Sequence, residues 1–389
     1  MTDTDTQLEK SDLILGYMPL SDSLPLLVAD TQGYFEAEGL NVELQQEVSW
    51  ANIRDKVLVG HLDGAQMLAP MLLATHLGLG GLKKAMMTPF AFGLNGNAFT
   101  ISRSLGKQLD ANSPEHVLAG DAVAAGKALK QVIKARRSCG DQPLVFATVY
   151  PYSIHNLLLR DWLAASGVDP DQDVTLVVLP PSQMVDHLSL SHIDGFCAGA
   201  PWNSVAIQKN VGECLLTGPD LWRSAPDKVL GLTQEWANAH PNTTLALVRA
   251  LDKATVWLDE NRNAAGTLLA ETIHVPLAAA LPALVGEFVY RPGEAEQQQP
   301  DMLVFHRSFA NYPWQEHGGW FLKQMQRWGW VSSALDCEEV VNQCFRTDLY
   351  HQALQLPALP DGTQLSLGHS EEWQLEGVVM APTAFTYRH

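Results

Sequence analysis

Residues 13–71 decide the fold class, and they read LILGYMPLSDSLPLLVADTQGYFEAEGLNVELQQEVSWANIRDKVLVGHLDGAQMLAPM. Apolar runs typical of β-strands alternate with longer stretches typical of helices: strands over 13–20, 41–47 and about 63–67, helices over 23–39 and 51–60. Gly39 follows the first helical stretch, where glycine commonly ends a helix. This alternation predicts an α/β lobe built on a parallel sheet.

A second lobe follows the Gly- and Asn-rich segment 92–102, FGLNGNAFTIS. The alternation begins again with a helix over 117–137, strands over 143–150, 174–180 and 192–199, and a helix that starts near Ser153. From Gln234 onward helical periodicity dominates. We therefore expect the first part of lobe I over 12–100, lobe II over 101–200, and a return to lobe I with a C-terminal helical region over 201–389.

The charge balance restricts the partners of the chain. Its 389 residues hold 43 acidic and 25 basic side chains, a formal net charge of -18, which disfavours direct binding to nucleic acid or to an anionic membrane. The two most apolar stretches, 67–82 and 273–290, are interrupted by proline and polar residues and are not expected to span a bilayer. The first residues, MTDTDTQLEKSD, do not resemble a secretory signal, so we expect a cytoplasmic location.

Common catalytic and metal-binding motifs are missing from the sequence. It contains no H-E-x-x-H, G-x-S-x-G, strand-linked G-x-G-x-x-G or EF-hand pattern, and its five cysteines form no C-x-x-C pair. The thirteen histidines are not spaced as metal ligands. We therefore predict a protein that is not an enzyme and that requires neither a cofactor nor a metal.

Two helix starts have the character of small-anion sites. Ser49 is positioned to cap a helix that begins with Trp50, and the free N–H groups of such a helix end attract negative charge. Ser153 is positioned in the same way ahead of His155, in a helix that Gly167 ends. The simpler interpretation makes Trp50 a core aromatic residue and His155 a structural histidine, and the residues alone leave both interpretations open.

Two further positions allow the same pair of interpretations. The turn from Gly93 to Asn97 suits a hinge or a close approach to a ligand, but equally an ordinary crossover. Lys228, in the segment APDKVLG, reaches either a cleft between the lobes or water. A buried lysine without a carboxylate nearby would be costly when no anion is bound, so we expect either an open, hydrated site or a bound ion.

The sequence resembles the nitrate- and bicarbonate-binding proteins of ABC importers, the NrtA and CmpA family. The resemblance begins with the segment quoted above and continues through FGLNGNAFTIS, SIHNLLLRDWLAASG, IDGFCAGAPWNSVAIQKNVGECLLT, PDKVLGLTQEWANAHPNT and NYPWQEHGGWFLKQMQRWGW, from about Asp12 to Gln355. It implies a type II periplasmic-binding-protein fold, α/β throughout, with two lobes around a hinged cleft that holds a small planar oxyanion. The positions that match the nitrate contacts of the family are Trp50, Gly93, Asn97, His155 and Lys228.

Two residues depart from the transport members of that family. Asn97 stands where they tend to have glutamine, and Ala200 stands where they tend to have glutamate. Together with the expected cytoplasmic location, these departures resemble the NasS branch, whose members sense nitrate and nitrite and hold an ANTAR-domain RNA-binding antiterminator until the ligand arrives. Lysine at 228 resembles the nitrate binders rather than the bicarbonate binder.

Two alternatives remain open from the sequence. The same fold serves as the substrate-binding subunit of nitrate or nitrite ABC importers. It also serves thiamine-pyrimidine synthases, although these are cysteine-rich around an iron site and this sequence has no such cluster. Because one fold carries many functions, the residues of the site must separate these alternatives.

Overall fold

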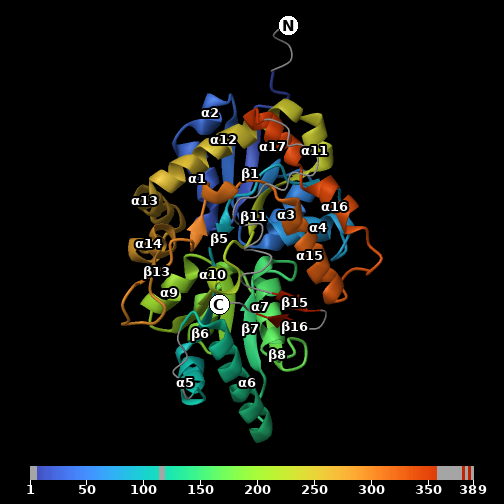
Figure 1. The fold of residues 1–389 in the computed structure, drawn as a ribbon. Helices are drawn as coiled ribbons and strands as arrows, with labels where there is room; N and C mark the ends of the chain where they lie inside the picture. Colours follow the sequence, from blue (N-terminus) through green and yellow to red (C-terminus); the bar gives the residue numbers. More distant parts are fainter. Residues whose placement is uncertain (1–6, 114–118, 357–378, 382–383, 387–389) are drawn as a thin grey trace. The chain divides into compact units, whose positions relative to one another are not determined.

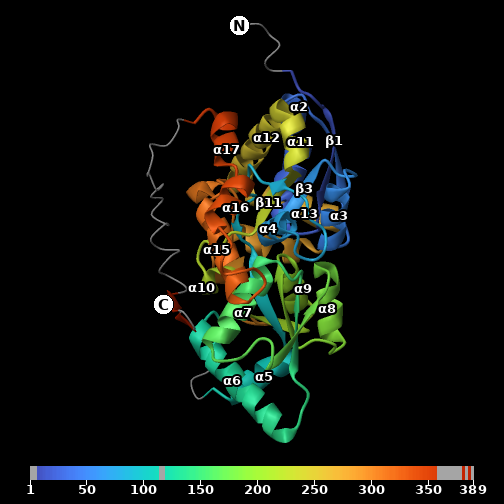
Figure 2. The same ribbon diagram turned by 90° about the vertical axis from the view of Figure 1, so that its right-hand side faces the viewer.

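The computed structural model describes residues 7–113, 119–356, 379–381 and 384–386 (Figures 1 and 2). The chain forms two compact units, and each unit is assembled from segments that are distant in the sequence. Unit 1 contains Met1–Leu94, Pro226–Asn261 and Val304–Gln364, and unit 2 contains Asn95–Ala225, Arg262–Leu303 and Leu365–His389.

Unit 1 is built on a five-stranded sheet of order β2-β1-β3-β11-β4. The strands are β1 (Asp12–Tyr17), β2 (Asn41–Gln46), β3 (Gly64–Leu68), β4 (Met86–Met87) and β11 (Lys228–Thr233). The pairs β1–β2 and β1–β3 are parallel, as the sequence predicts. However, β11 pairs with both β3 and β4 in the antiparallel direction, so the sheet is mixed.

The helices of unit 1 form two groups. The helices α1, α2, α12 and α17 contact one another, as do α4, α15 and α16, and α3 contacts β3 and β11 (Figure 1). The bounds are α1 (Leu24–Thr31), α2 (Tyr34–Ala37), α3 (Trp50–Leu58), α4 (Ala69–Leu77), α11 (Gln234–Ala239), α12 (Pro241–Glu260), α15 (Gln315–Arg327), α16 (Cys337–Cys344) and α17 (Thr347–Leu354), with short 3-10 turns η2 (Ser21–Ser23) and η3 (Arg307–Phe309). Their inward-facing apolar side chains form the core of the unit.

Unit 2 has its own five-stranded sheet, of order β10-β6-β9-β7-β8. The strands are β6 (Asn97–Ser102), β7 (Leu144–Thr148), β8 (Val174–Val178), β9 (Gly195–Gly199) and β10 (Gly212–Thr217). The pairs β7–β8 and β7–β9 are parallel, whereas β6 is antiparallel to β9 and to β10. Phe99 packs edge-on against Phe146 and also contacts Trp162, so aromatic side chains fill the space between this sheet and its helices.

The helices of unit 2 are α5 (Arg103–Ala111), α6 (Ala122–Cys139), α7 (Ile154–Ala165), α8 (Pro181–Ser189), α9 (Trp202–Gln208), α10 (Gly218–Leu221), α13 (Arg262–Ile273) and α14 (Leu277–Val285). The short pairs β12 (Glu287–Phe288) with β13 (Gln297–Gln298), and β15 (Val379–Ala381) with β16 (Ala384–Thr386), complete the unit. The strands β5 (Leu94–Asn95) and β14 (Leu303–Val304) lie at positions where the chain passes between units.

Several predicted elements are divided or shortened in the structure. The helix predicted over 23–39 is two helices, α1 and α2, because Gly33 adopts a left-handed conformation at φ +70°. The helix predicted over 117–137 is α6, and its first two predicted residues lie outside the described part of the chain. The continuous helical periodicity over 242–273 is interrupted at Asn261, where the chain leaves unit 1.

The boundaries of the units differ from the predicted lobes. The first boundary lies after Leu94 rather than after residue 100, because β6 belongs wholly to the sheet of unit 2. Residues 201–225 also stay with unit 2, since β10 pairs with β6. The segment 262–303 belongs there too, as α14 contacts α9. The sequence has no local mark for these boundaries because each depends on strand or helix pairing.

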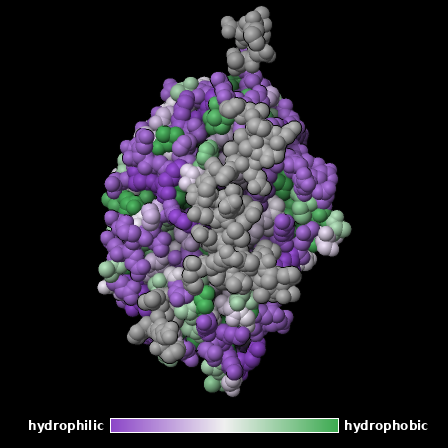
Figure 3. Space-filling view, in the orientation of Figure 1, coloured by the Kyte–Doolittle hydropathy of each residue, from purple (hydrophilic) through white to green (hydrophobic). Residues whose placement is uncertain are grey.

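On the face shown in Figure 3, hydrophobic residues are scattered among hydrophilic ones. Of the helices that the structure describes, none combines the length and the apolar character that a bilayer crossing requires. These observations agree with the ordinary globular composition of the chain.

Candidate functional site

The residues predicted to bind an anion in unit 1 lie at one edge of its sheet. Here the edge is the one formed by the C-terminal ends of the parallel strands β1 and β3, which end at Tyr17 and Leu68. The antiparallel strand β11 starts at this edge, because its first residue, Lys228, pairs with Leu68. The short turn η2 follows β1 at the same edge. This topology brings Lys228 close to residues more than 150 positions earlier in the sequence.

Lys228 is buried, with 1% of its surface exposed, and two carboxylates bond to it. Its Nζ lies 2.7 Å from Oδ2 of Asp22 and also donates to Asp227. Burial alone would lower the pKa of Lys228, but the adjacent Asp22 and Asp227 carboxylates raise this pKa above its ordinary value. Lys228 is therefore an ammonium ion whose charge is balanced within unit 1.

The side chain of Gln66 holds Asp22 in place. Gln66 Nε2 donates to Oδ1 of Asp22, and Gln66 Oε1 accepts the backbone N–H of Met18 at 2.8 Å. Both Gln66 and Asp22 are buried. A chain of hydrogen bonds therefore runs from the backbone that follows β1, through Gln66 and Asp22, to Lys228.

These contacts change the expectation for Lys228. We expected a lysine without a neighbouring carboxylate, and therefore an open, hydrated site or a bound ion, but Asp22 and Asp227 satisfy the ammonium without a ligand. Asp227 precedes Lys228 directly, so the sequence did contain a signal for one of the two. Asp22 is separated from Lys228 by 206 positions, and only the strand pairing reveals it.

Trp50 lies beside Lys228, and its predicted contact with a ligand stays a prediction. Ser49 caps α3 and accepts the N–H of Asn52 at 3.2 Å, which confirms the predicted helix start. The Lys228 Nζ is 5.7 Å from the centroid of the Trp50 ring, within the range of a cation–π contact. Trp50 is 1% exposed, and its Nε1 has no hydrogen-bond partner among the described residues.

Ser21 presents a second buried donor in unit 1. It precedes Asp22 in η2, and its Oγ has no hydrogen-bond partner in the described part of the chain. Ser23 in the same turn is also buried, but its Oγ donates to the carbonyl of Leu20 at 2.7 Å. Buried hydroxyls normally have partners, so Ser21 is a candidate donor to a ligand. Ser21 is not among the ligand residues predicted from the sequence.

Gly93 occupies a position where only glycine fits. Its φ is +147°, and a Cβ atom there would lie 2.4 Å from the carbonyl oxygen of Val304. The neighbouring residue Phe92 donates its N–H to the carbonyl of Lys228 at 2.9 Å. The structure therefore places the backbone at Gly93 next to the start of β11, whereas its predicted close approach to a ligand stays a prediction.

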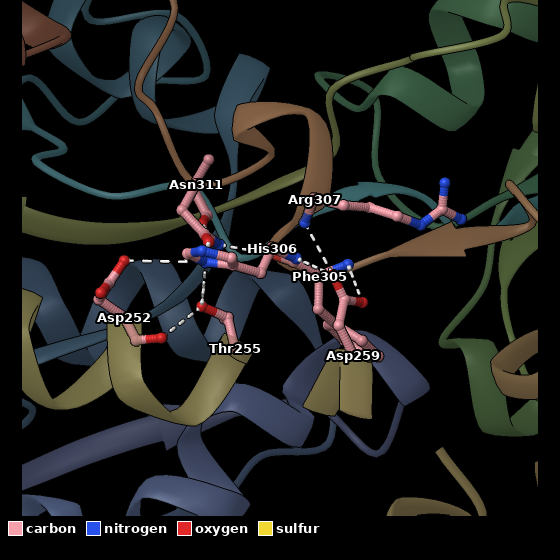
Figure 4. A network of polar contacts seen from close by, with 8 residues as sticks. Asp252, Thr255, Asp259, Phe305, His306, Arg307 and Asn311 are labelled. Carbon is pink, nitrogen blue, oxygen red and sulfur yellow. Dashed lines mark hydrogen bonds and ion pairs between the residues drawn. The ribbon is translucent and has the colours of Figure 1, made fainter. Parts of the chain in front are cut away.

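A polar network joins residues 305–311 to Asp252, Thr255 and Asp259 of α12 (Figure 4). Asn311 Nδ2 donates to the carbonyls of Ala91 and Phe305 at 2.9 and 2.7 Å. The carboxylate of Asp259, near the end of α12, accepts backbone N–H groups of residues 305–307, the shortest from Arg307 at 2.7 Å. Asn311 therefore connects the backbone two residues before Gly93 to the segment 305–311, and Asp259 connects that segment to α12.

Asn97 is the first residue of β6 in unit 2, and it is buried. A Cβ atom on Gly218 would lie 2.7 Å from Oδ1 of Asn97, so this glycine permits the side chain to occupy its position. The Nδ2 of Asn97 has no hydrogen-bond partner among the described residues. An amide donor without a partner is what a ligand contact at Asn97 would need, although no observation here tests that contact.

His155 lies in the first turn of α7, also in unit 2, and is fully buried. Ser153 caps this helix: its Oγ accepts the N–H of Asn156 at 3.1 Å and donates to the carbonyl of Tyr150 at 2.7 Å. Gly167, at φ +72°, follows the end of α7, as predicted. The local geometry predicted for His155 is therefore present, whereas its role in binding stays a prediction.

The structure thus brings together part of the predicted set. In unit 1 Trp50 lies beside the Lys228 side chain and Gly93 follows the residue bonded to the Lys228 carbonyl, while Asp22 and Gln66 join Lys228 through hydrogen bonds. Asn97 and His155 lie on β6 and α7, two elements of unit 2 that contact each other. Among the described residues there is no group of three or more histidine, cysteine or acidic side chains arranged to hold a metal ion.

Comparison with known proteins gives consistent results. Residues 6–273 match the model of the NMT1-like family. The chain is 30% identical over 364 residues to the nitrate/nitrite binding protein NrtA of a Nostoc species, covering 91% of this chain and 79% of that protein. It is 36% identical to the nitrate import ATP-binding protein NrtC of a Synechocystis species, covering 96% of this chain but only 54% of that protein.

The crystal structure of the periplasmic nitrate-binding protein NrtA from Synechocystis superposes with a TM-score of 0.81 at 26% identity, covering 91% of this chain and 90% of that one. The alkanesulfonate-binding protein SsuA of Xanthomonas axonopodis shares the fold, with a TM-score of 0.56 at 16% identity, covering 81% of this chain and 93% of that one. The predicted periplasmic-binding-protein fold is therefore confirmed.

Proposed function

The chain belongs to the NMT1-like family and is related to nitrate-binding proteins, and from this we propose that it binds nitrate or nitrite as its ligand. The observation that carries the proposal is the cluster in unit 1, where the buried Trp50 lies beside Lys228 and has an unused indole N–H. Nitrate offers only acceptor oxygens, so donors without partners are the groups it requires. The relatives are named as a nitrate/nitrite binding protein and a nitrate import protein, which supports a binding role.

The proposed ligand residues are Trp50, Gly93 and Lys228 in unit 1 and Asn97 and His155 in unit 2. Each would supply a donor or a close backbone approach to the anion. Loss of one hydrogen bond to a charged ligand costs about 1.5–3 kcal/mol, which is roughly a 10- to 150-fold loss of affinity. Replacing Trp50 by phenylalanine or Asn97 by leucine should therefore weaken binding by about this factor.

The test is titration calorimetry of the whole chain with nitrate, nitrite, bicarbonate and sulfate. Matched controls exist for both variants. Trp236 donates its Nε1 to Asp63 at 2.8 Å, and Asn203 donates its Nδ2 to backbone and side-chain oxygens of unit 2, so Trp236→Phe and Asn203→Leu remove structural donors only. If the wild-type chain binds neither nitrate nor nitrite, or if the Trp50 and Asn97 variants bind as the wild type does, the proposal is wrong.

We also propose a cellular role for the binding of nitrate or nitrite. We infer that the chain is a cytoplasmic nitrate/nitrite sensor that holds an ANTAR-domain antiterminator and releases it when the anion binds. The support is the resemblance to the NasS branch at Asn97 and Ala200. A net charge of -18 also suits contact with a basic partner protein better than direct contact with RNA. If the anion lowers the affinity of the sensor for the antiterminator by some factor, thermodynamic linkage requires that the antiterminator lower the affinity of the sensor for the anion by the same factor.

Size-exclusion chromatography with the ANTAR-domain protein encoded next to this chain tests the sensor proposal. Co-elution without ligand and separation in nitrate are expected, with chloride at equal concentration as the control for ionic strength. Co-elution that nitrate and nitrite do not change, or separate elution under every condition, would contradict the proposal. A complex that separates equally in chloride would contradict it as well.

The second candidate function is the substrate-binding subunit of a nitrate or nitrite ABC importer. The relatives favour it directly, because NrtC is named as an import protein and the solved NrtA structure is described as periplasmic. The chain spans about half the length of NrtC, so any activity of the complete importer stays a proposal for this chain. Fractionation of cells that express the native gene separates the two candidates, since an importer subunit is recovered outside the cytoplasm and the sensor within it.

A further inference from the structure

We propose that Asp22 restricts this site to ligands of a single negative charge, by balancing the charge of Lys228 from within the fold. The inference rests on the proposed anion-binding function and goes beyond it, because it names the residue that would separate nitrate or nitrite from sulfate or phosphate. It concerns unit 1 alone.

The contacts of Lys228 leave little positive charge for a ligand. An ammonium has three N–H groups, and the Lys228 ammonium gives one to Asp22 at 2.7 Å and one to Asp227. The side chain of Lys228 is fully buried and that of Asp22 is 6% exposed, so solvent screens this pair weakly. Asp22 and Asp227 together carry two negative charges against the single positive charge of Lys228. An anion at this place would meet an ammonium that already has two carboxylate partners rather than an isolated cation.

The position of Asp22 is fixed rather than adjustable. Its Oδ1 accepts from Gln66, and Gln66 in turn accepts the backbone N–H of Met18, so Asp22 cannot turn away from Lys228 without breaking two buried hydrogen bonds. An arriving anion would therefore meet the carboxylate in its present place. The repulsion between them becomes part of the binding free energy.

Two neutral donors remain, together with the third N–H of the Lys228 ammonium. Trp50 Nε1 and Ser21 Oγ are buried and have no partners among the described residues, and one N–H of Lys228 is not used by either carboxylate. Neutral donors can bond the oxygens of a weakly hydrated monovalent ion. They do not compensate the second charge of sulfate, which each nearby carboxylate also repels.

The size of the effect follows from the geometry. The hydrogen bonds of an ammonium diverge tetrahedrally, so an anion on the third N–H would lie about 4.5 Å from the Asp22 oxygen. At an effective dielectric constant of about 20, the repulsion of one unit charge at that distance changes an association constant by about 10²-fold or more. A divalent anion experiences this repulsion twice. When the Asp22 charge is removed, the association constant for sulfate should therefore increase by nearly the square of the factor by which the association constant for nitrate increases.

The experiment is calorimetric titration of Asp22→Asn with nitrate and with sulfate at pH 7, compared with wild type. We expect nitrate to gain about tenfold in affinity and sulfate about a hundredfold, with solvent and structural relaxation reducing the Coulomb figure for both. Asp227→Asn is the second variant, so the inference stays testable if Asp22→Asn does not fold. Circular dichroism checks the fold of each variant.

A matched control lies at the opposite edge of the same sheet. Asp63 is also a buried carboxylate paired with a lysine, Lys10, and it accepts the N–H of Ile14 in β1. Asp63→Asn removes one charge from unit 1 without changing the cluster, so it should leave the ratio of sulfate to nitrate affinity unchanged.

The outcomes separate the two proposals. If the wild-type chain binds neither nitrate nor nitrite, the proposed function fails and this inference fails with it. If the wild type binds nitrate while Asp22→Asn changes nitrate and sulfate by the same factor, or changes neither, the charge restriction is wrong and the proposed function stands. A loss of nitrate binding in Asp22→Asn would also overturn the inference, because it would show that Asp22 serves to position Lys228.

Discussion

Replacing Lys228 by methionine tests the ion-paired cluster of unit 1. Methionine is long and apolar like the lysine stem, so the variant keeps most of the packing but leaves Asp22 and Asp227 buried without the ammonium to which both are bonded. Removing one partner of a buried ion pair costs about 3–5 kcal/mol. Each kcal/mol lowers the Tm of a domain of this size by roughly 2–4 °C, so we expect a Tm lower by about 6–20 °C at pH 7.

The dependence on pH identifies the cause. In the wild type, the raised pKa of Lys228 gives a stabilisation that is fully present below the unfolded pKa of about 10.4 and is lost only as the pH rises through the higher folded value. Between pH 5 and pH 8 this contribution is constant. In the methionine variant, protonation of a carboxyl group removes the cost of an unpaired buried charge. The difference in Tm between wild type and variant should therefore narrow as the pH falls from 7 to 5.

Thermal unfolding followed by circular dichroism at pH 5, 6, 7 and 8 measures both effects. Lys10→Met is the control, since Lys10 is paired with Asp63 but has 40% of its side chain exposed, and pairs exposed to solvent contribute little. The double variant with Asp22→Asn should recover part of the lost stability. A Lys228→Met variant as stable as Lys10→Met, or a double variant less stable than Lys228→Met, would refute the reasoning.

Three further predictions address single contacts. Ser23→Ala should lose about 1 kcal/mol in urea unfolding because the Leu20 carbonyl loses the hydroxyl donor and keeps only the backbone N–H of Ser23. Ser21→Ala should lose nothing, since Ser21 Oγ has no partner among the described residues, and equal losses would contradict this assignment. Asp259→Ala should lose about 2–3 kcal/mol and speed amide hydrogen exchange at His306 and Arg307, and unchanged exchange would show that the network of Figure 4 is not required there. Burial lowers the pKa of His317 to about 3, so stability should fall by up to about 1.4 kcal/mol per pH unit as the pH drops below 6.5, and a His317→Gln variant that loses stability as steeply would contradict this cause.

The features that the sequence predicts well are local. Ser49 and Ser153 cap their helices, and Gly39 and Gly167 follow helix ends, because each of these roles depends on residues within one helical turn. The parallel pairing of β1 with β2 and β3 was predictable for a related reason, since the strand–helix alternation leaves few other arrangements. Positions of Trp50 and His155 at helix starts follow from the same local signals.

The features that the sequence does not predict depend on distant segments. Nothing near Lys228 indicates that β11 runs antiparallel to β3, and that direction is what brings Lys228 to the edge of the sheet where Asp22 lies. The division at Asn261 of a continuous helical pattern is also invisible locally, because α12 and α13 have similar periodicity but belong to different units. Charge reversal at Lys228 is an obvious variant to consider. In the structure it would create a buried cluster of three carboxylates, which is why a neutral replacement is the better experiment.

The pattern of unpaired donors connects the predicted residues to the structure. Most buried polar atoms in proteins have a hydrogen-bond partner, so a buried donor without one requires an explanation. The resemblance names Trp50 and Asn97 as ligand contacts, and the indole N–H of the first and the amide nitrogen of the second both lack partners among the described residues. Ser21 shares this property and precedes the carboxylate bonded to Lys228. Hydrogen-bond donors without partners suit an ion of low charge that only accepts hydrogen bonds. The charge of Lys228 is already paired with two carboxylates, so Lys228 would attract a highly charged anion only weakly.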